Sequence, residues 1–96
     1  MSNLKEALLK VVTSKGAFDS EYAVQIHSFD GREVSLFTDK QNVESSADGK
    51  SFMKVYVLTS KPSEGKERLL LPSEAFETSS RWLDVNQDDV KECVAP

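Results

Sequence analysis

A two-residue alternation of apolar and polar side chains between Tyr22 and Leu71 constrains this chain more than any other feature. Around Val24 and Ile26, for example, every second side chain is apolar. Successive side chains of a β-strand point to opposite faces, so this rhythm predicts strands that each bury one face. We expect such strands at 21–29, 32–38, 51–60 and 66–71.

Two Asp-Gly pairs predict where the chain turns. Asp30-Gly31 separates the first two expected strands, and Asp48-Gly49 closes a polar stretch at 39–50. Asp-Gly between alternating runs is a strong hairpin signal, because a type I′ turn needs a positive φ at both central residues. Long loops are often mobile or functional, so we expect 39–50 to be the flexible tip of the molecule.

The N-terminal segment has a different pattern. Its apolar residues recur at the spacing of one helix face, at Leu4, Ala7, Leu8, Val11 and Val12. Asn3 and Glu6 resemble a capping box, and Lys15-Gly16 resembles a helix stop. We therefore predict an amphipathic helix over 3–14.

The last quarter of the chain is ambiguous. Residues 73–80 could form one or two helical turns with Ala75 and Phe76 turned inward. A fifth strand over 81–85 would bury Trp82 together with Leu83 or Val85, before a helical turn at 86–90 and a short strand at 91–95.

The rival interpretation of this quarter is one helix from Ser80 to Glu92. That helix would place Asn86 on its buried face, so we prefer strand, turn and strand.

These elements predict an α+β fold in one domain of 96 residues. The short N-terminal helix would precede an antiparallel meander of four to five strands over 20–94. The strands would form a small SH3-like barrel, or an open sheet with the helix across one face.

Charge is distributed unevenly along the chain. Residues 1–73 carry ten acidic and ten basic residues, so the net charge of −4 lies entirely within 74–96. That segment has two basic residues, Arg81 and Lys91. Its six acidic residues are Glu74, Glu77, Asp84, Asp88, Asp89 and Glu92. An acidic surface repels phosphate backbones and favours a basic partner.

Compartment is predicted from what the chain lacks. Cys93 is the only cysteine, so no internal disulfide can form. Lys5, Glu6 and Lys10 interrupt the apolar residues that a signal peptide would need, and no run approaches about 20 apolar residues. We expect a cytoplasmic protein that does not enter a membrane.

No motif predicts catalysis, a metal or a cofactor. Residues 84–89 match the start of a calcium loop, but Asp89 stands where glycine is required and Ala95 where glutamate is required. His27 has no identifiable nucleophile or orienting partner, so we expect an exposed imidazole. Cys93 has no neighbouring ligand at metal spacing.

The remaining candidates are recognition residues. Tyr56, Phe76 and Trp82 are the aromatic side chains to consider, with core packing as the default for each. An exposed tryptophan beside arginine is typical of interface hot spots. The predicted binding surface consists of Arg81, Trp82, Asp84, Asp88 and Asp89.

We therefore predict a non-enzymatic protein-interaction or regulatory module with a basic or amphipathic partner. One alternative is an enzyme or accessory subunit whose carboxylate site is completed by oligomerisation. A second alternative is single-stranded nucleic-acid binding on the sheet, which needs exposed aromatic residues beside lysines.

Overall fold

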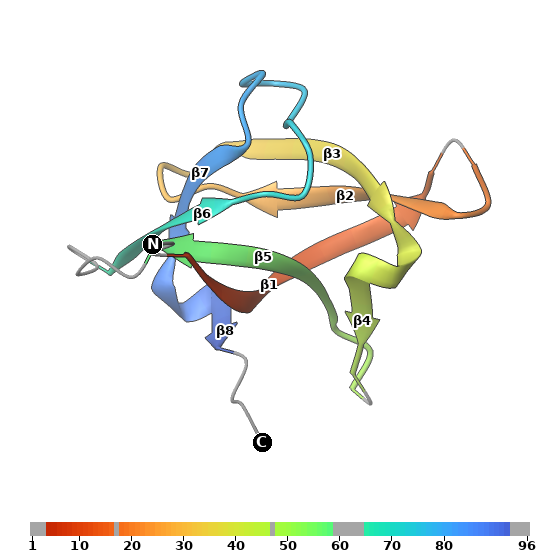
Figure 1. Cartoon of the computed structure of the whole chain (residues 1–96), viewed down its shortest axis with the longest axis horizontal. Coiled ribbons are helices and arrows are strands. Elements are labelled where there is room, and N and C mark those ends of the chain that lie inside the picture. Colours follow the sequence, from red (N-terminus) through yellow and green to blue (C-terminus); the bar gives the residue numbers. More distant parts are fainter. Residues whose placement is uncertain (1–3, 17, 47, 59–64, 93–96) are drawn as a thin grey trace.

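The chain forms an antiparallel β-sheet that curls into a half-barrel (Figure 1). The computed structural model describes residues 4–16, 18–46, 48–58 and 65–92. Its elements, in chain order, are β1 (Leu4–Lys15), β2 (Glu21–His27), β3 (Glu33–Asp39), the 3₁₀ turn η1 (Lys40–Asn42), β4 (Val43–Ser45), β5 (Ser51–Leu58), β6 (Lys66–Leu70), β7 (Trp82–Asn86), the 3₁₀ turn η2 (Gln87–Asp89) and β8 (Val90–Glu92). The strand order is β3-β2-β1-β5-β6-β7, with β4 paired to β5 and β8 paired to β1.

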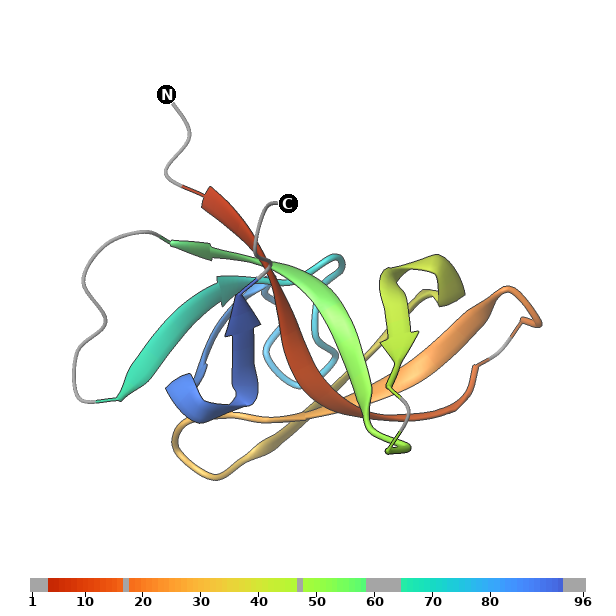
Figure 2. The same ribbon diagram turned by 90° about the horizontal axis from the view of Figure 1, so that it is seen from below.

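Strand β1 holds the two halves of the sheet together. Its last residues, 12–15, pair with β2, whereas residues 4–11 pair with β5. Residues 7–9 also pair with β8 on the opposite side from β5. Figure 2 shows β1 curving as it passes from β5 in one half of the sheet to β2 in the other.

The predicted N-terminal helix is wrong, because this segment is the long strand β1. Ala7, Leu9 and Val11 are buried, while Val12 is 60% exposed. The doublets Leu8-Leu9 and Val11-Val12 fit a helical stripe and a strand alternation equally well. An isolated helix of this length is marginal in water, whereas β1 gains hydrogen-bonded partners on both sides.

The α+β fold class is therefore corrected to an antiparallel half-barrel, and the four- to five-stranded meander to eight strands within the described part of the chain. Gly16 does not end a helix but allows a close approach in the β1–β2 connection, where a Cβ would lie 2.7 Å from the Glu21 carbonyl oxygen. The expected loop at 39–50 contains η1 and β4. Val43 of β4 packs against the core.

The β2–β3 hairpin is confirmed, but its turn differs from the predicted type. Ser28 N–H donates to the Arg32 carbonyl (2.8 Å), and Gly31 N–H donates to the Ser28 carbonyl (3.1 Å). Gly31 has φ of 86°, whereas Ser79 is the only non-glycine with positive φ among the described residues. Asp30 therefore has negative φ, which excludes type I′ and fits a type I turn followed by a glycine bulge.

The β4–β5 turn repeats the same arrangement. The sequence Ser-x-Asp-Gly followed by a cation occurs at 28–32 and again at 46–50. Ser46 N–H donates to the Lys50 carbonyl (2.8 Å), Gly49 N–H donates to the Ser46 carbonyl (3.0 Å), and Gly49 has φ of 85°. In both turns the serine hydroxyl donates to the aspartate carboxylate. The first turn carries Phe29 where the second carries Ala47, so the sequence pattern does not require an aromatic residue there.

The last quarter is strand, turn and strand, so the rival helix over 80–92 is wrong. No helix is assigned at 73–80, although one isolated turn closes there, with the Ser79 N–H donating to the Ala75 carbonyl (2.9 Å). Ala75 is buried as predicted, and both Leu83 and Val85 are buried, whereas the prediction paired only one of them with Trp82. Trp82 is instead 45% exposed, because it is next to buried Leu83 on a strand, and Phe76, also expected inside, is 60% exposed at the start of a turn.

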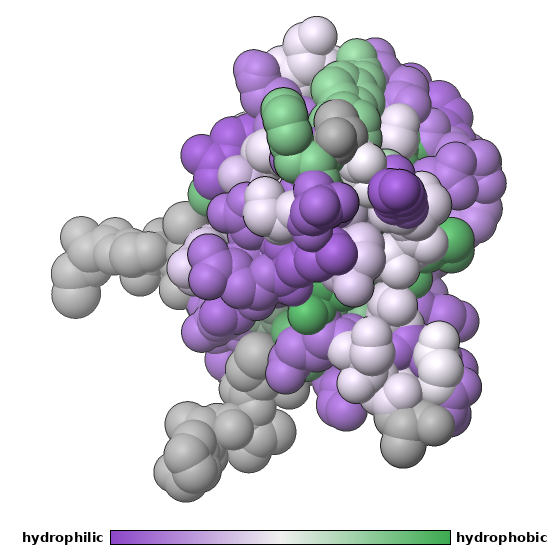
Figure 3. Space-filling view, turned by 90° about the vertical axis from the view of Figure 1, so that its right-hand side faces the viewer, coloured by the Kyte–Doolittle hydropathy of each residue, from purple (hydrophilic) through white to green (hydrophobic). Residues whose placement is uncertain are grey.

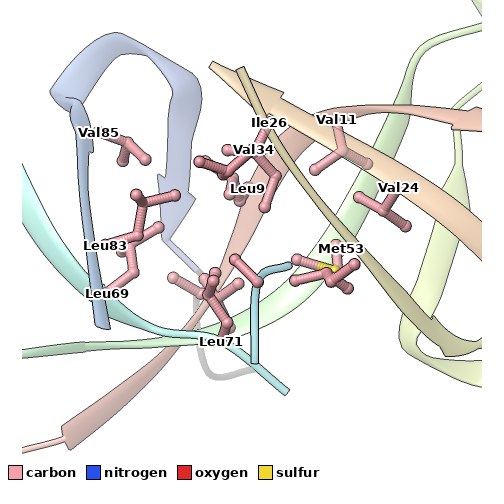
Figure 4. Close-up of a cluster of buried hydrophobic side chains, with 14 residues drawn as sticks. Leu9, Val11, Val24, Ile26, Val34, Met53, Leu69, Leu71, Leu83 and Val85 are labelled. Atoms are coloured by element: carbon pink, nitrogen blue, oxygen red, sulfur yellow. The ribbon is translucent and has the colours of Figure 1, made fainter. Parts of the chain in front are cut away.

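One hydrophobic cluster fills the interior of the half-barrel. Figure 4 shows its side chains pointing toward one another from both halves of the sheet. The largest fully buried members are Leu9, Ile26, Leu36, Met53, Leu69 and Leu71. Each contributes about 1.5–3 kcal/mol by leaving water, so this cluster is the main source of stability.

The β6–β7 loop covers the free edge of β3. Phe76 N–H donates to the Ser35 carbonyl (2.8 Å), and Ser73 Oγ donates to the Phe37 carbonyl (2.7 Å). The Glu77 carboxylate accepts from the Ser35 N–H (2.7 Å) and from its hydroxyl (2.7 Å). Main-chain groups of an edge strand that would otherwise face solvent are thereby paired.

At the other end of the sheet, the β2–β3 turn meets β7. Phe29 N–H donates to the Asp84 carbonyl (2.8 Å), and both views of the ribbon show the turn beside β7 (Figures 1 and 2).

No helix among the described residues is long or apolar enough to cross a membrane.

Candidate functional site

A groove of about 350 Å³ opens where the β2–β3 turn meets β6 and β7. Aromatic and charged side chains dominate its lining: Phe29, Trp82, Arg32, Lys66, Arg68, Asp30 and Asp84. Ser28, Thr78 and Leu83 complete the walls. The lining thus combines two aromatic residues with charges of both signs.

Strand alternation positions the β7 part of the groove. Leu83 and Val85 face the core, so Trp82 and Asp84 both face outward. Pairing with β6 then places Arg68 directly opposite Asp84. Cross-strand neighbours on one face are close enough for their side chains to interact.

A charge network crosses the floor of the groove. Arg68 Nε donates to Asp84 Oδ1 (2.9 Å), and Arg68 Nη2 donates to Asp84 Oδ2 (3.3 Å). Lys66 Nζ lies 3.9 Å from Asp84 Oδ2. The hydrogen bonds from Arg68 lower the pKa of Asp84, and the charge of Lys66 acts in the same direction. Asp84 is therefore an ionised acceptor shared by two cations.

The turn supplies a second charged pair. Arg32 Nε lies 2.9 Å from Asp30 Oδ2, and the Ser28 hydroxyl donates to the same carboxylate. The hydrogen bond from Ser28 lowers the pKa of Asp30, and Arg32 contributes in the same direction. The turn thus presents a fixed carboxylate and guanidinium at the rim.

Aromatic surface completes the groove. Phe29 is 37% exposed and Trp82 is 45% exposed. Lys66 Nζ lies 5.7 Å from the centre of the Phe29 ring, within cation–π distance. The groove can therefore offer apolar contact, hydrogen-bond donors and charge to one ligand.

The structure divides the predicted binding surface. Trp82 and Asp84 lie together in the groove, whereas the Arg81 Nε donates to the Leu71 carbonyl (2.9 Å) outside its lining. Asp88 and Asp89 lie on η2, and Asp89 lines a separate small hollow beside Lys10 and His27. The acidic rim expected around Trp82 does not form at the groove.

Sequence reasoning did not assign Phe29, Lys66 and Arg68 to this site. The alternation of Lys66 and Arg68 along β6 was a usable signal, since two residues two apart on a strand share a face. Phe29 gave no such signal, because its position depends on the turn meeting a strand more than fifty residues later.

Other predicted candidates lie elsewhere. His27 is exposed, with Nε2 3.8 Å from Glu33 Oε1. Tyr56, on β5, is 43% exposed and does not line the groove. Cys93 lies outside the described residues.

A second apolar surface involves phenylalanines. Phe18 and Phe76 are 70% and 60% exposed, and the Phe76 ring contacts Phe37 edge to face at 5.2 Å. Figure 3 shows hydrophobic side chains gathered near the top of the face from which the β1–β2 hairpin projects. None of these three phenylalanines lines the groove.

Hydrogen bonds hold both carboxylates of the groove in their ionised form. A general acid needs a raised pKa, whereas hydrogen bonds to Arg68 and Ser28 lower the pKa values of Asp84 and Asp30. Within the described residues, no three histidine, cysteine or acidic side chains cluster as metal ligands would. The arrangement can bind and orient a ligand.

Stability is expected to fall on acidification. Hydrogen bonds lower the pKa values of Asp30, Asp48, Glu77 and Asp84 in the folded chain. Their stabilisation is therefore present above the unfolded value of about 4 and is lost as pH falls through the lower folded values. Urea midpoints measured from pH 7 to pH 2 should decrease mainly below about pH 4.5.

The variant Asp84→Asn should flatten this pH dependence, because its side chain cannot titrate. Asp88→Asn, on η2 and outside the network, is the control and should keep the wild-type profile. Equal pH profiles for wild type and Asp84→Asn would contradict the contribution of Asp84.

Comparison with protein-family models, with curated proteins and with solved structures finds no match to this chain.

Proposed function

We propose that this chain is a non-enzymatic protein-interaction module that binds a short segment of a partner protein in the groove. The observation that carries the proposal is Trp82, which is 45% exposed beside Arg68 and Asp84 in that groove. Tryptophan and arginine are enriched among residues that dominate binding energy. An exposed indole on a rigid strand loses little conformational entropy when a ligand covers it.

Phe29 supports the same assignment. The Ser-x-Asp-Gly turn makes the same two main-chain hydrogen bonds across itself at 46–50, where the sequence has alanine at the corresponding position. The aromatic side chain is thus not demanded by the turn pattern and is available for recognition. Its main-chain N–H, bonded to the Asp84 carbonyl, fixes the ring's position beside β7.

A random peptide library displayed on phage tests the proposal. Peptides that the wild-type chain selects should bind Trp82→Ala at least about 30-fold more weakly, the equivalent of about 2 kcal/mol. Because Trp82 is the only tryptophan, peptides without tryptophan should also change its fluorescence directly. Phe29→Ala should weaken the same peptides, and circular dichroism should show that both variants fold.

Phe18→Ala is the matched control, because this exposed aromatic residue lies outside the groove. It should leave affinity unchanged. Selected peptides that bind Trp82→Ala and Phe29→Ala as tightly as wild type would refute the groove as the binding site.

Single-stranded nucleic acid is the second candidate, and one observation favours it. Lys66 lies over Phe29 in a groove that also exposes Trp82, a combination of cation and aromatic surface that can stack bases. The net charge of −4 and the carboxylate at each cation oppose it. Quenching of Trp82 by oligothymidylate, with affinity falling steeply between 50 and roughly 200 mM salt, would replace the protein-interaction proposal.

A further inference from the structure

We infer that the groove recognises an acidic partner segment, in which an aspartate or glutamate stands next to an apolar side chain. The inference rests on the proposed function and specifies the partner's chemistry. It also reverses the preference for a basic partner that the sequence's charge distribution suggests.

The first argument is the charge balance of the groove. Its lining has three cations and two carboxylates. Asp30 is paired with Arg32, whereas Asp84 is shared by Lys66 and Arg68. The floor of the groove therefore carries one positive charge that no carboxylate of the lining neutralises.

The second argument is the accessibility of that charge. The Arg68 side chain is 59% exposed, and the Lys66 side chain is 34% exposed. Lys66 Nζ is 3.9 Å from Asp84, too long for a strong hydrogen bond, so its ammonium has donors to offer. A ligand carboxylate between Lys66 and Arg68 would match the surplus charge and accept those donors.

The third argument concerns what the groove would reject. A ligand lysine or arginine would have to compete with Arg32 for Asp30, or with Lys66 and Arg68 for Asp84, and it would lie close to those cations. Like charges brought together in a groove are costly, and such repulsion is a common source of specificity.

The aromatic rings of Phe29 and Trp82 are the surface that would contact the apolar side chain of the partner segment. Phe29 lies next to Lys66, so an apolar side chain resting on Phe29 and Trp82 would lie beside the acidic one. The chain's negative charge, concentrated in 74–96, does not prevent this contact. Repulsion over more than about 8–10 Å is screened at physiological salt, whereas contacts within the groove are not.

The peptide pool selected by the wild-type chain tests this inference. Among peptides that lose binding to Trp82→Ala, we expect aspartate or glutamate next to an apolar residue to be enriched and lysine and arginine to be depleted. One selected peptide is then synthesised with capped ends, together with its glutamate-to-glutamine form, and both are titrated by Trp82 fluorescence. The acidic form should bind on the order of tenfold more tightly at 50 mM salt.

A charge-removing variant in the groove locates the effect. Lys66→Met keeps most of the aliphatic stem and should reduce the tenfold preference to about twofold or less. Lys50→Met is the control, because it changes net charge equally but lies in the second Ser-x-Asp-Gly turn, outside the groove. It should retain the full preference.

The possible results separate the two proposals. Trp82-dependent peptides without acidic enrichment, or with a preference for lysine, would overturn the acidic-partner inference and leave the binding groove intact. A pool in which no peptide depends on Trp82 would contradict the groove itself. An equal loss of preference in Lys50→Met would assign the effect to net charge and would also overturn the inference.

Discussion

Replacing Leu9 with alanine should lower the free energy of unfolding by about 2–5 kcal/mol, because its side chain is fully buried in the half-barrel. Total stability for a domain is only about 5–15 kcal/mol, so this one change removes a large fraction of it. Urea denaturation followed by circular dichroism measures the loss. A fall in the unfolding midpoint without a change in slope is the expected form of the result.

The neighbouring residue is the matched control. Leu8 has the same side chain but faces the other side of β1, where it is only half-buried, so Leu8→Ala should cost about 1 kcal/mol or less. In a helix over 3–14 the order would reverse, because Leu8 belongs to the apolar stripe and Leu9 does not. A greater loss in Leu8→Ala than in Leu9→Ala would therefore contradict the strand.

Removing the Glu77 carboxylate should increase self-association of the chain. Glu77 accepts hydrogen bonds from the Ser35 N–H and hydroxyl on the outer edge of β3. In Glu77→Ala that edge would expose an unpaired N–H, and exposed edges pair with the edges of other molecules. Light scattering and size-exclusion chromatography over a range of concentrations should show larger species than for wild type.

Glu74→Ala tests whether this effect belongs to the edge or to lost negative charge. Glu74 is an exposed acid of the same loop, and removing it changes net charge by the same amount. It should behave as wild type. Faster amide exchange at Ser35 in Glu77→Ala alone would link self-association to the opened edge, whereas equal association in both variants would assign it to charge.

Much of the sheet was predictable because its alternation is unambiguous. In β2 and β3, Val24, Ile26, Val34 and Leu36 recur at every second position with mostly polar residues between them, so a strand fits them better than a helix. Asp30-Gly31 then located the hairpin, although a glycine bulge replaced the expected turn type. The local pattern agrees with the final structure wherever the two-residue period of a strand fits the apolar residues and the 3.6-residue period of a helix does not.

The N-terminal strand was not predictable in the same way. Doublets such as Leu8-Leu9 allow both periods, and the decision comes from partners in β5 and β8 that no local window contains. Sequence also could not decide whether Trp82 or Leu83 faces the core, since both are large and apolar. A one-residue shift in register exchanges the two faces of a strand.

The candidate groove was predictable only in part. Trp82 and Asp84, two apart on an expected strand, had to share a face, and so did Lys66 and Arg68. These four residues meet Phe29 in one groove only because the sheet curls far enough to bring the β2–β3 turn to β7. The charge pattern of the last quarter did not show that Asp84 pairs with residues of β6.

Pairing between β1 and β8 has a consequence for synthesis on the ribosome. Leu9 is synthesised 81 residues before its neighbour Val90. A nascent chain that has not reached β8 must leave that side of β1 without its final partner. The sheet around β1 can therefore be completed only after β8 has been made, and a chaperone acting on the growing polypeptide would find an unpaired strand edge there.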